Sequence, residues 1–180
     1  MKRNILLAAT IGMFSLMSLG CSKDDDVSGE VGTEYLKVKV DGVEKNFAVV
    51  SAYWADGENT LSMNGTIMDG NKPSEALMIS VISDDTRVPA GQYSLDDATS
   101  FTILAAHMHM QGTGQVNSGA TRDTETKDDA FNLKIDKIDN SNVKGSFSGV
   151  LAQTQGLNTL GKVTLTDGKF SRVLNTEHPK

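Results

Sequence analysis

Two histidines separated by one residue, His107 and His109, are the side chains whose type and spacing could most directly support chemistry. On a β-strand, such residues point to the same face with backbones about 7 Å apart, so both rings could bind one metal ion. A metal site also needs a third ligand and outer groups that orient the first ones. The sequence places no acidic residue beside the pair, so His107 and His109 are weak metal candidates, and we predict neither a metal site nor a cofactor.

The residues interleaved with these histidines form the opposite face of the same predicted strand. Leu104, Met108 and Met110 are apolar, and methionine commonly fills gaps in protein cores. We therefore expect this face to be buried and interpret the methionines as core residues rather than copper ligands. His107 and His109 are then expected on a partly solvated face near the end of the strand.

Other catalytic patterns are absent from the sequence. There is no Gly-X-Ser-X-Gly motif, and only His107 and His109 could act as bases within the predicted folded domain. The adjacent aspartate pairs cannot act as acid and base on their own, because neighbouring side chains on an extended chain point apart. We predict no catalytic residues and a non-enzymatic protein. The alternative is a metal-assisted hydrolase that uses His107 and His109.

Two adjacent aromatic residues, Tyr53 and Trp54, form a candidate binding platform for a sugar or peptide. Neighbours on a strand face opposite sides, so one ring could be exposed close to the Asp56-Gly57 turn. Trp54 shares its parity with small and apolar residues, which favours a core position for its ring.

The single cysteine, Cys21, follows an apolar segment with a short basic start, which has the proportions of a secretory signal peptide. The residues Ser18-Leu19-Gly20-Cys21 resemble a bacterial lipobox. This resemblance implies cleavage before Cys21 and attachment of diacylglycerol to its sulfur. Two or more acyl chains anchor a protein to a bilayer stably, so the expected partner is a membrane, bound through the lipid on Cys21.

The cluster after this cysteine, Ser22-Lys23-Asp24-Asp25-Asp26, resembles the surface-export signal of Bacteroidota lipoproteins. This resemblance implies an outer-membrane location facing the cell exterior. Four short phrases farther along the chain also resemble small Bacteroidota lipoproteins of unknown function: Val38-Lys39-Val40-Asp41-Gly42, Gly91-Gln92-Tyr93-Ser94-Leu95, Gly145-Ser146-Phe147-Ser148 and Thr166-Asp167-Gly168-Lys169-Phe170.

Charge limits the choice of partners. The chain has a formal net charge of −6, and removing Lys2 and Arg3 with the signal peptide lowers it to −8. An acidic protein lacks the broad positive field that attracts nucleic-acid backbones, so we predict no nucleic-acid partner. With one cysteine, an internal disulfide is impossible, and the domain must be stabilised by its core.

The remaining chain reads as β-strands, because apolar residues recur with period two between Gly, Asp and Asn turns. We predict a single antiparallel β-sandwich or barrel-like meander of roughly nine or ten strands. In it, Val43 to Trp54 is expected to form one long strand, and the strands from Phe131 onward a sequential C-terminal meander with a turn at Asp167-Gly168. Gly145, inside a strand of this meander, is expected to mark a bulge or a close backbone approach. The predicted organisation is a signal peptide over 1–20, a lipidated cysteine with a flexible acidic tether over 21–33, the β domain over 34–174 and a tail over 175–180. The function expected is binding of an envelope protein, a glycan or a small molecule.

Overall fold

The structure is a computed structural model that describes residues 34–55, 59–84, 86–95, 100–120, 131–155 and 158–175. The regular structure of these residues is all β, which confirms the predicted fold class. The described strands belong to one compact unit, Gly32–Lys180. The predicted signal peptide, Cys21, the export signal at residues 22–26 and all but the first residue of the predicted tail lie outside the described residues.

Eleven strands are present in the described part of the chain. The first six are β1 (Tyr35–Val40), β2 (Val43–Phe47), β3 (Val49–Ala55), β4 (Thr60–Asp69), β5 (Lys72–Ser83) and β6 (Gly91–Ser94). The other five are β7 (Phe101–Gln111), β8 (Gly114–Gly119), β9 (Asn132–Ile138), β10 (Asn142–Gln155) and β11 (Asn158–Asn175).

The first hairpin shows how the local sequence specifies this structure. β1 buries every second residue, as its alternating pattern predicts. Asp41 and Gly42 follow with positive φ angles of 48° and 80°, which the two central residues of a type I′ hairpin turn require. The Asp41 carboxylate accepts a hydrogen bond from the Thr164 amide at 2.8 Å, so the turn is also held against β11.

The strands form one connected sheet in the order β2-β1-β11-β3-β4-β5-β7-β8-β10-β9-β6. β10 also pairs with β11, so the pairings among β11, β3, β4, β5, β7, β8 and β10 run in a ring. β3 and β11 are parallel, whereas the other pairings are antiparallel. The sheet is therefore mixed, where the sequence predicted an antiparallel one.

Two segments of the chain differ from the predicted strands. The segment from Val43 to Trp54 was expected to be one strand, but it divides at Ala48 into β2, which pairs with β1, and β3, which pairs with β4. The predicted C-terminal meander is confirmed, because β9, β10 and β11 pair in sequence order. Asp167-Gly168, expected as a turn, lies within the continuous strand β11 where its register with β1 and β10 shifts.

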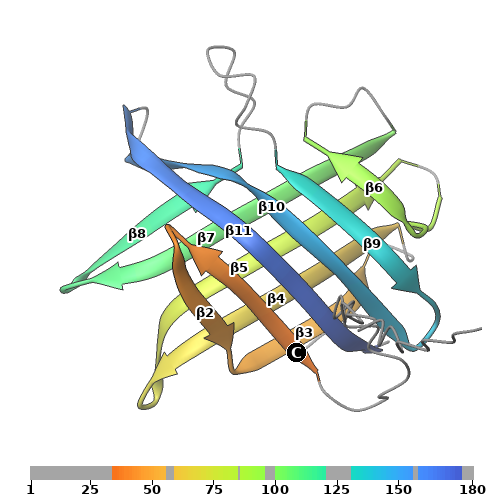
Figure 1. Cartoon of the computed structure of the whole chain (residues 1–180), viewed down its shortest axis with the longest axis horizontal. Coiled ribbons are helices and arrows are strands. Elements are labelled where there is room, and N and C mark those ends of the chain that lie inside the picture. Colours follow the sequence, from red (N-terminus) through yellow and green to blue (C-terminus); the bar gives the residue numbers. More distant parts are fainter. Residues whose placement is uncertain are drawn as a thin grey trace, which may run out of the picture. The chain divides into compact units, whose positions relative to one another are not determined.

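Figure 1 shows two groups of strands crossing at a steep angle. We call β2, β1, β11, β10, β9 and β6 the front group, and β3, β4, β5, β7 and β8 the back group. The buried apolar side chains of both groups belong to one cluster, which includes Phe131, Phe147 and Phe170. The face of each group that carries these residues is its inner face, and the opposite face is its outer face.

Candidate functional site

A buried polar cluster on the inner faces of the two groups contains one of the predicted histidines. His107 on β7 donates a hydrogen bond from Nε2 to Oε1 of Glu75 on β5 at 2.8 Å, because an ionised carboxylate can only accept. The second oxygen of Glu75 accepts a hydrogen bond from Lys45 Nζ on β2 at 2.8 Å. Glu75 therefore connects the front group to the back group through two charge-assisted contacts.

His109 extends this cluster along β7. Its ring stacks on that of His107 with centroids 5.6 Å apart and an interplanar angle of 27°. Among the described residues, the buried Nδ1 atoms of both rings have no hydrogen-bond partner, and neither does the hydroxyl oxygen of Ser118, which faces His107 across the β7–β8 pairing. Buried polar atoms are normally paired, so three unpaired atoms in one place give this position unused hydrogen-bonding capacity.

The ionisation of Glu75 depends on these contacts. Burial acts to raise its pKa, but the hydrogen bonds and charges of Lys45 and His107 together outweigh burial and hold the pKa of Glu75 below its usual value of 4.5. A charged Glu75 is favoured at neutral pH. The cluster is therefore an ion-paired element of the core with unfilled hydrogen-bonding capacity at the histidine end.

The surroundings of the two histidines differ from each other. His109 is half-buried near the end of β7, as predicted, but only 2% of His107 is exposed, whereas a partly solvated face was expected. Conversely, Leu104 and Met110 are 47% and 42% exposed on the outer face of β7, so their interpretation as core residues was wrong. The reason is that Ile103 and Ala105 share the histidine face and enter the core, where Glu75 accepts the hydrogen bond of His107 and is itself paired with Lys45.

Among the described residues, the two histidines are not joined by enough further ligands to bind a metal ion. Within the described ranges, no three or more His, Cys, Asp or Glu side chains are grouped so as to hold a metal ion. Glu75 contacts His107 as a hydrogen-bond acceptor, which is the outer contact that commonly orients a metal-binding histidine. His107 and His109 thus have a supporting carboxylate but no third ligand from the described residues.

The candidate platform residues Tyr53 and Trp54 lie on opposite faces of β3. Trp54 is 7% exposed and belongs to the core cluster, and the Arg87 guanidinium lies over its ring at 4.4 Å from the centroid. Tyr53 is half-buried on the outer face, opposite Ser62 of β4. Only Tyr53 presents part of its ring to solvent.

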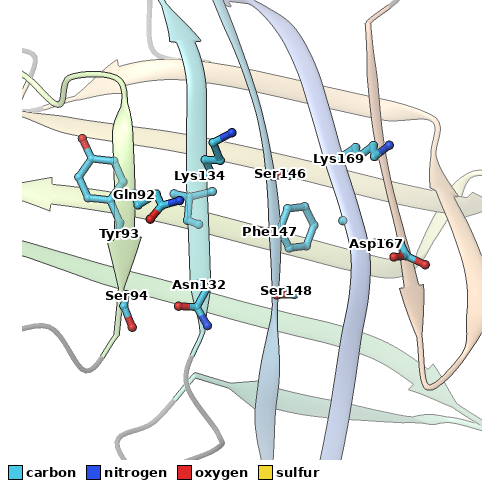
Figure 2. Close-up of a pocket in the computed structure, with 12 residues that line it drawn as sticks. Gln92, Tyr93, Ser94, Asn132, Lys134, Ser146, Phe147, Ser148, Asp167 and Lys169 are labelled. Carbon is cyan, nitrogen blue, oxygen red and sulfur yellow. The ribbon is translucent and has the colours of Figure 1, made fainter. Parts of the chain in front are cut away.

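A pocket of 640 Å³ lies along β6, β9, β10 and β11 of the front group (Figure 2). Its lining combines amide, hydroxyl and charged side chains with backbone around buried aromatic rings: Gln92, Tyr93, Ser94, Asn132, Leu133, Lys134, Ser146, Phe147, Ser148, Asp167, Gly168 and Lys169. This mixture offers several hydrogen-bonding groups at the surface of a rigid sheet.

Buried contacts hold the aromatic residues beneath this pocket. The Tyr93 hydroxyl donates to the Pro89 carbonyl oxygen, and its ring meets Phe101 edge-to-face with centroids 5.1 Å apart. Burial raises the pKa of Tyr93 to about 12, so this residue remains a neutral hydrogen-bond donor. The pocket floor is therefore fixed by the core.

Sequence reasoning did not identify the pocket. Its polar residues are distributed over four strands and carry no motif, and β6 next to β9 could not be anticipated from the order of the chain. Two signals were available. Gln92, Ser146 and Lys169 lie in phrases that resemble small Bacteroidota lipoproteins, and Lys134, Ser146 and Lys169 share outward parity, but neither signal reveals which strands are neighbours.

Comparisons with protein families, with curated proteins and with solved structures found no match. Over the described residues, no helix has the length and apolar character needed to cross a membrane.

Proposed function

We propose that this chain is a non-enzymatic lipoprotein, anchored to the outer membrane through Cys21 and displayed on the cell surface, whose β domain binds a ligand or partner molecule. The observation that carries the binding role is the 640 Å³ pocket on the front group. Its polar lining suits hydrogen bonding to a hydrated ligand, and the strands that support it need no rearrangement to bind.

The anchoring part of the proposal rests on the sequence. The apolar leader, Ser18-Leu19-Gly20-Cys21 and the aspartates at positions 24–26 together resemble a lipoprotein export region. Acylation would leave the chain without a free thiol, because Cys21 is its only cysteine. A small domain exported in this way is stabilised by its core and does not depend on disulfides.

The same proposal includes a closed architecture for the β domain. The ring of pairings that joins β10 to β11 supports a barrel-like arrangement in which the front and back groups share one core. Such closure removes free strand edges within the ring, which suits a protein exposed outside the cell.

Thiol labelling on intact cells tests this function. Ser146→Cys places a thiol in the pocket, and Lys72→Cys places one at the exposed start of β5 in the back group. With Cys21 acylated, each variant has one reactive thiol. A membrane-impermeant maleimide should label both variants on cells, and it should label Ser146→Cys more slowly on cells than after purification, because a bound molecule shields the pocket.

The control separates the parts of the proposal. Lys72→Cys should react at the same rate on cells and after purification. Absence of labelling at both positions on intact cells would contradict surface display. Equal rates on cells and after purification at Ser146→Cys would contradict occupancy of the pocket. Cys21→Ala should abolish incorporation of a radioactive fatty acid, and retained incorporation would contradict the anchor.

A metal-assisted hydrolase that uses His107 and His109 is the second candidate function. It is favoured by one observation: Glu75 accepts from His107 Nε2 and orients that ring, and the buried Nδ1 atoms of both histidines have no partner among the described residues. Elemental analysis of the purified protein tests it, because stoichiometric zinc that is lost in His107→Ala with His109→Ala would support this alternative over the non-enzymatic one.

A further inference from the structure

The outer face of the front group carries a row of cross-strand neighbours with three lysines. The pairing register places Lys37 of β1 opposite Lys169 of β11, Lys169 opposite Ser146 of β10, Ser146 opposite Lys134 of β9, and Lys134 opposite Gln92 of β6. We call these five residues the lysine row. Adjacent strands lie about 4.8 Å apart, so Lys169 and Lys134 are separated by roughly 10 Å at the backbone.

The charges of this row are only partly balanced. Lys134 forms an ion pair with Asp136 at 2.7 Å. Among the described acidic residues, none forms an ion pair with Lys37 or Lys169. Lys37 instead lies 5.7 Å from the centroid of the Tyr35 ring. Like charges directly opposite each other on a sheet are unfavourable, so the Lys37–Lys169 pair is a local electrostatic cost that a bound anion would remove.

Asp167 is the acidic residue of the pocket, and it is directed to a different lysine. Its carboxylate contacts Lys39 Nζ of β1 at 2.8 Å, and Figure 2 shows it lying toward β1 and away from Lys134. Its pKa is lowered mainly by this contact with Lys39, while Lys169 contributes less. Among the described residues, Lys169 therefore keeps an ammonium group without an ion pair at one side of the pocket, and Lys134, paired with Asp136, places a second ammonium group at the other side.

Resting on the ligand-binding function proposed above, we propose that the pocket and the lysine row bind an acidic polysaccharide that bears carboxylate or sulfate groups. The lysines match the repeated negative charges of such a chain. Ser146 lies between Lys169 and Lys134, and with Ser148 and Gln92 it provides the donors and acceptors that sugar hydroxyls require.

Other polyanions fit this face less well. Single-stranded nucleic acids are held largely by exposed aromatic rings that stack on bases, but the aromatic residues that line the pocket, Tyr93 and Phe147, are buried. An anionic bilayer is a broad, flat surface, whereas the hydrogen-bonding groups here line a pocket. Polysaccharide chains are narrow enough to place hydroxyl and acidic groups in the pocket together.

The experiment measures binding of the detergent-solubilised full-length protein to immobilised heparin, polygalacturonate and neutral dextran. Heparin or polygalacturonate should bind, and binding should weaken as NaCl is raised. Lys134→Gln with Lys169→Gln should lower the affinity about tenfold, since two partly screened charge contacts are lost. Lys134→Arg with Lys169→Arg keeps both positive charges and should retain binding. Lys72→Gln removes the same charge from the exposed start of β5 and should leave the affinity unchanged.

Several outcomes would overturn the proposal. Dextran binding as tight as that of the acidic polymers would show that charge does not select the ligand. Tighter binding of a DNA duplex or of phosphatidylglycerol vesicles through the same lysines would assign the face to a different anion. No binding of either acidic polymer would refute the acidic polysaccharide, and continued shielding of Ser146→Cys on cells would then show that the broader binding function stands without it.

Discussion

Glu75 is a buried carboxylate whose two oxygens accept hydrogen bonds from different basic side chains, Lys45 and His107. This arrangement allows His107 to occupy the core despite its polarity. Sequence reasoning recognised the spacing of His107 and His109, but it placed His107 on a partly solvated face, whereas this residue is buried. The face of a strand is determined by all its neighbours. The partner of His107 is Glu75 of β5, which is in turn paired with Lys45 of β2, and both strands are distant from β7 in the sequence.

We predict that Glu75→Gln destabilises the protein by about 2 kcal/mol. An amide oxygen can accept from one of the two donors, so the other donor loses its partner, and the loss at Lys45 is moderated because this side chain is 32% exposed. Urea unfolding followed by tryptophan fluorescence measures the effect. Glu44→Gln changes an exposed residue on the same strand as Lys45 and should alter stability little, so equal effects of the two substitutions would contradict the role of Glu75.

The same carboxylate predicts a pH dependence of stability. Its folded-state pKa lies below 4.5, so its contribution is fully present above pH 4.5 and is lost as the pH falls through the lowered value. The difference in unfolding free energy between wild type and Glu75→Gln should therefore shrink in acid, because protonated Glu75 resembles glutamine. Urea titrations from neutral pH to below pH 4 measure this difference. A difference that stays constant over this range would contradict the lowered pKa.

At the scale of the elements, close approaches between strands explain why glycine occupies positions inside strands, where its low strand propensity would disfavour it. Gly145 lies on β10 beside Phe170 and the Lys134 carbonyl, in agreement with the expectation that a glycine inside this strand marks a bulge or close backbone approach. Alternation and turn residues predicted most strands. They could not predict that β11 is long enough to pair with β1, β3 and β10, because that depends on bulges and on contacts across the whole chain.

Gly65 provides a test of the packing between the two groups of strands. A Cβ atom there would collide with the Leu36 side chain and lie 2.8 Å from Cβ of Phe47, so the front group must shift to accept it. Gly65→Ala should destabilise the protein by about 1–3 kcal/mol. Gly119→Ala, whose new Cβ would lie 3.8 Å from the Ala105 carbonyl oxygen, serves as the matched control. Thermal unfolding measures both variants, and equal melting temperatures would contradict this packing.

At the scale of the whole molecule, one core joins both groups of strands, and the last residues of β11 complete it. Leu174 is 5% exposed, is paired with Ala52 of β3 and donates its amide hydrogen to the Ser141 carbonyl oxygen at 2.7 Å. The sequence indicated an all-β domain that ends near this position. It did not indicate that the C-terminal strand contacts the back group, because parallel pairing between distant segments leaves no local signal.

We expect Leu174→Ala to lower the free energy of unfolding by about 2–3 kcal/mol, since it removes a buried side chain next to the parallel pairing. Its neighbour Val173 is 46% exposed, so Val173→Ala should cost much less. Urea denaturation of both variants gives the comparison. Similar midpoints for the two variants would show that the end of β11 does not complete the core.

The pairing of β1 with β11 also determines when folding can finish. Tyr35 pairs with Ser171, so the first described strand obtains this neighbour only after β11 has been synthesised. Closing such a long segment is entropically costly, and structures with distant pairings form slowly. A nascent chain therefore lacks this neighbour of β1 while the local hairpins between β1 and β11 can already form. The topology that stabilises the finished domain thus delays the completion of its sheet until the last described strand is present.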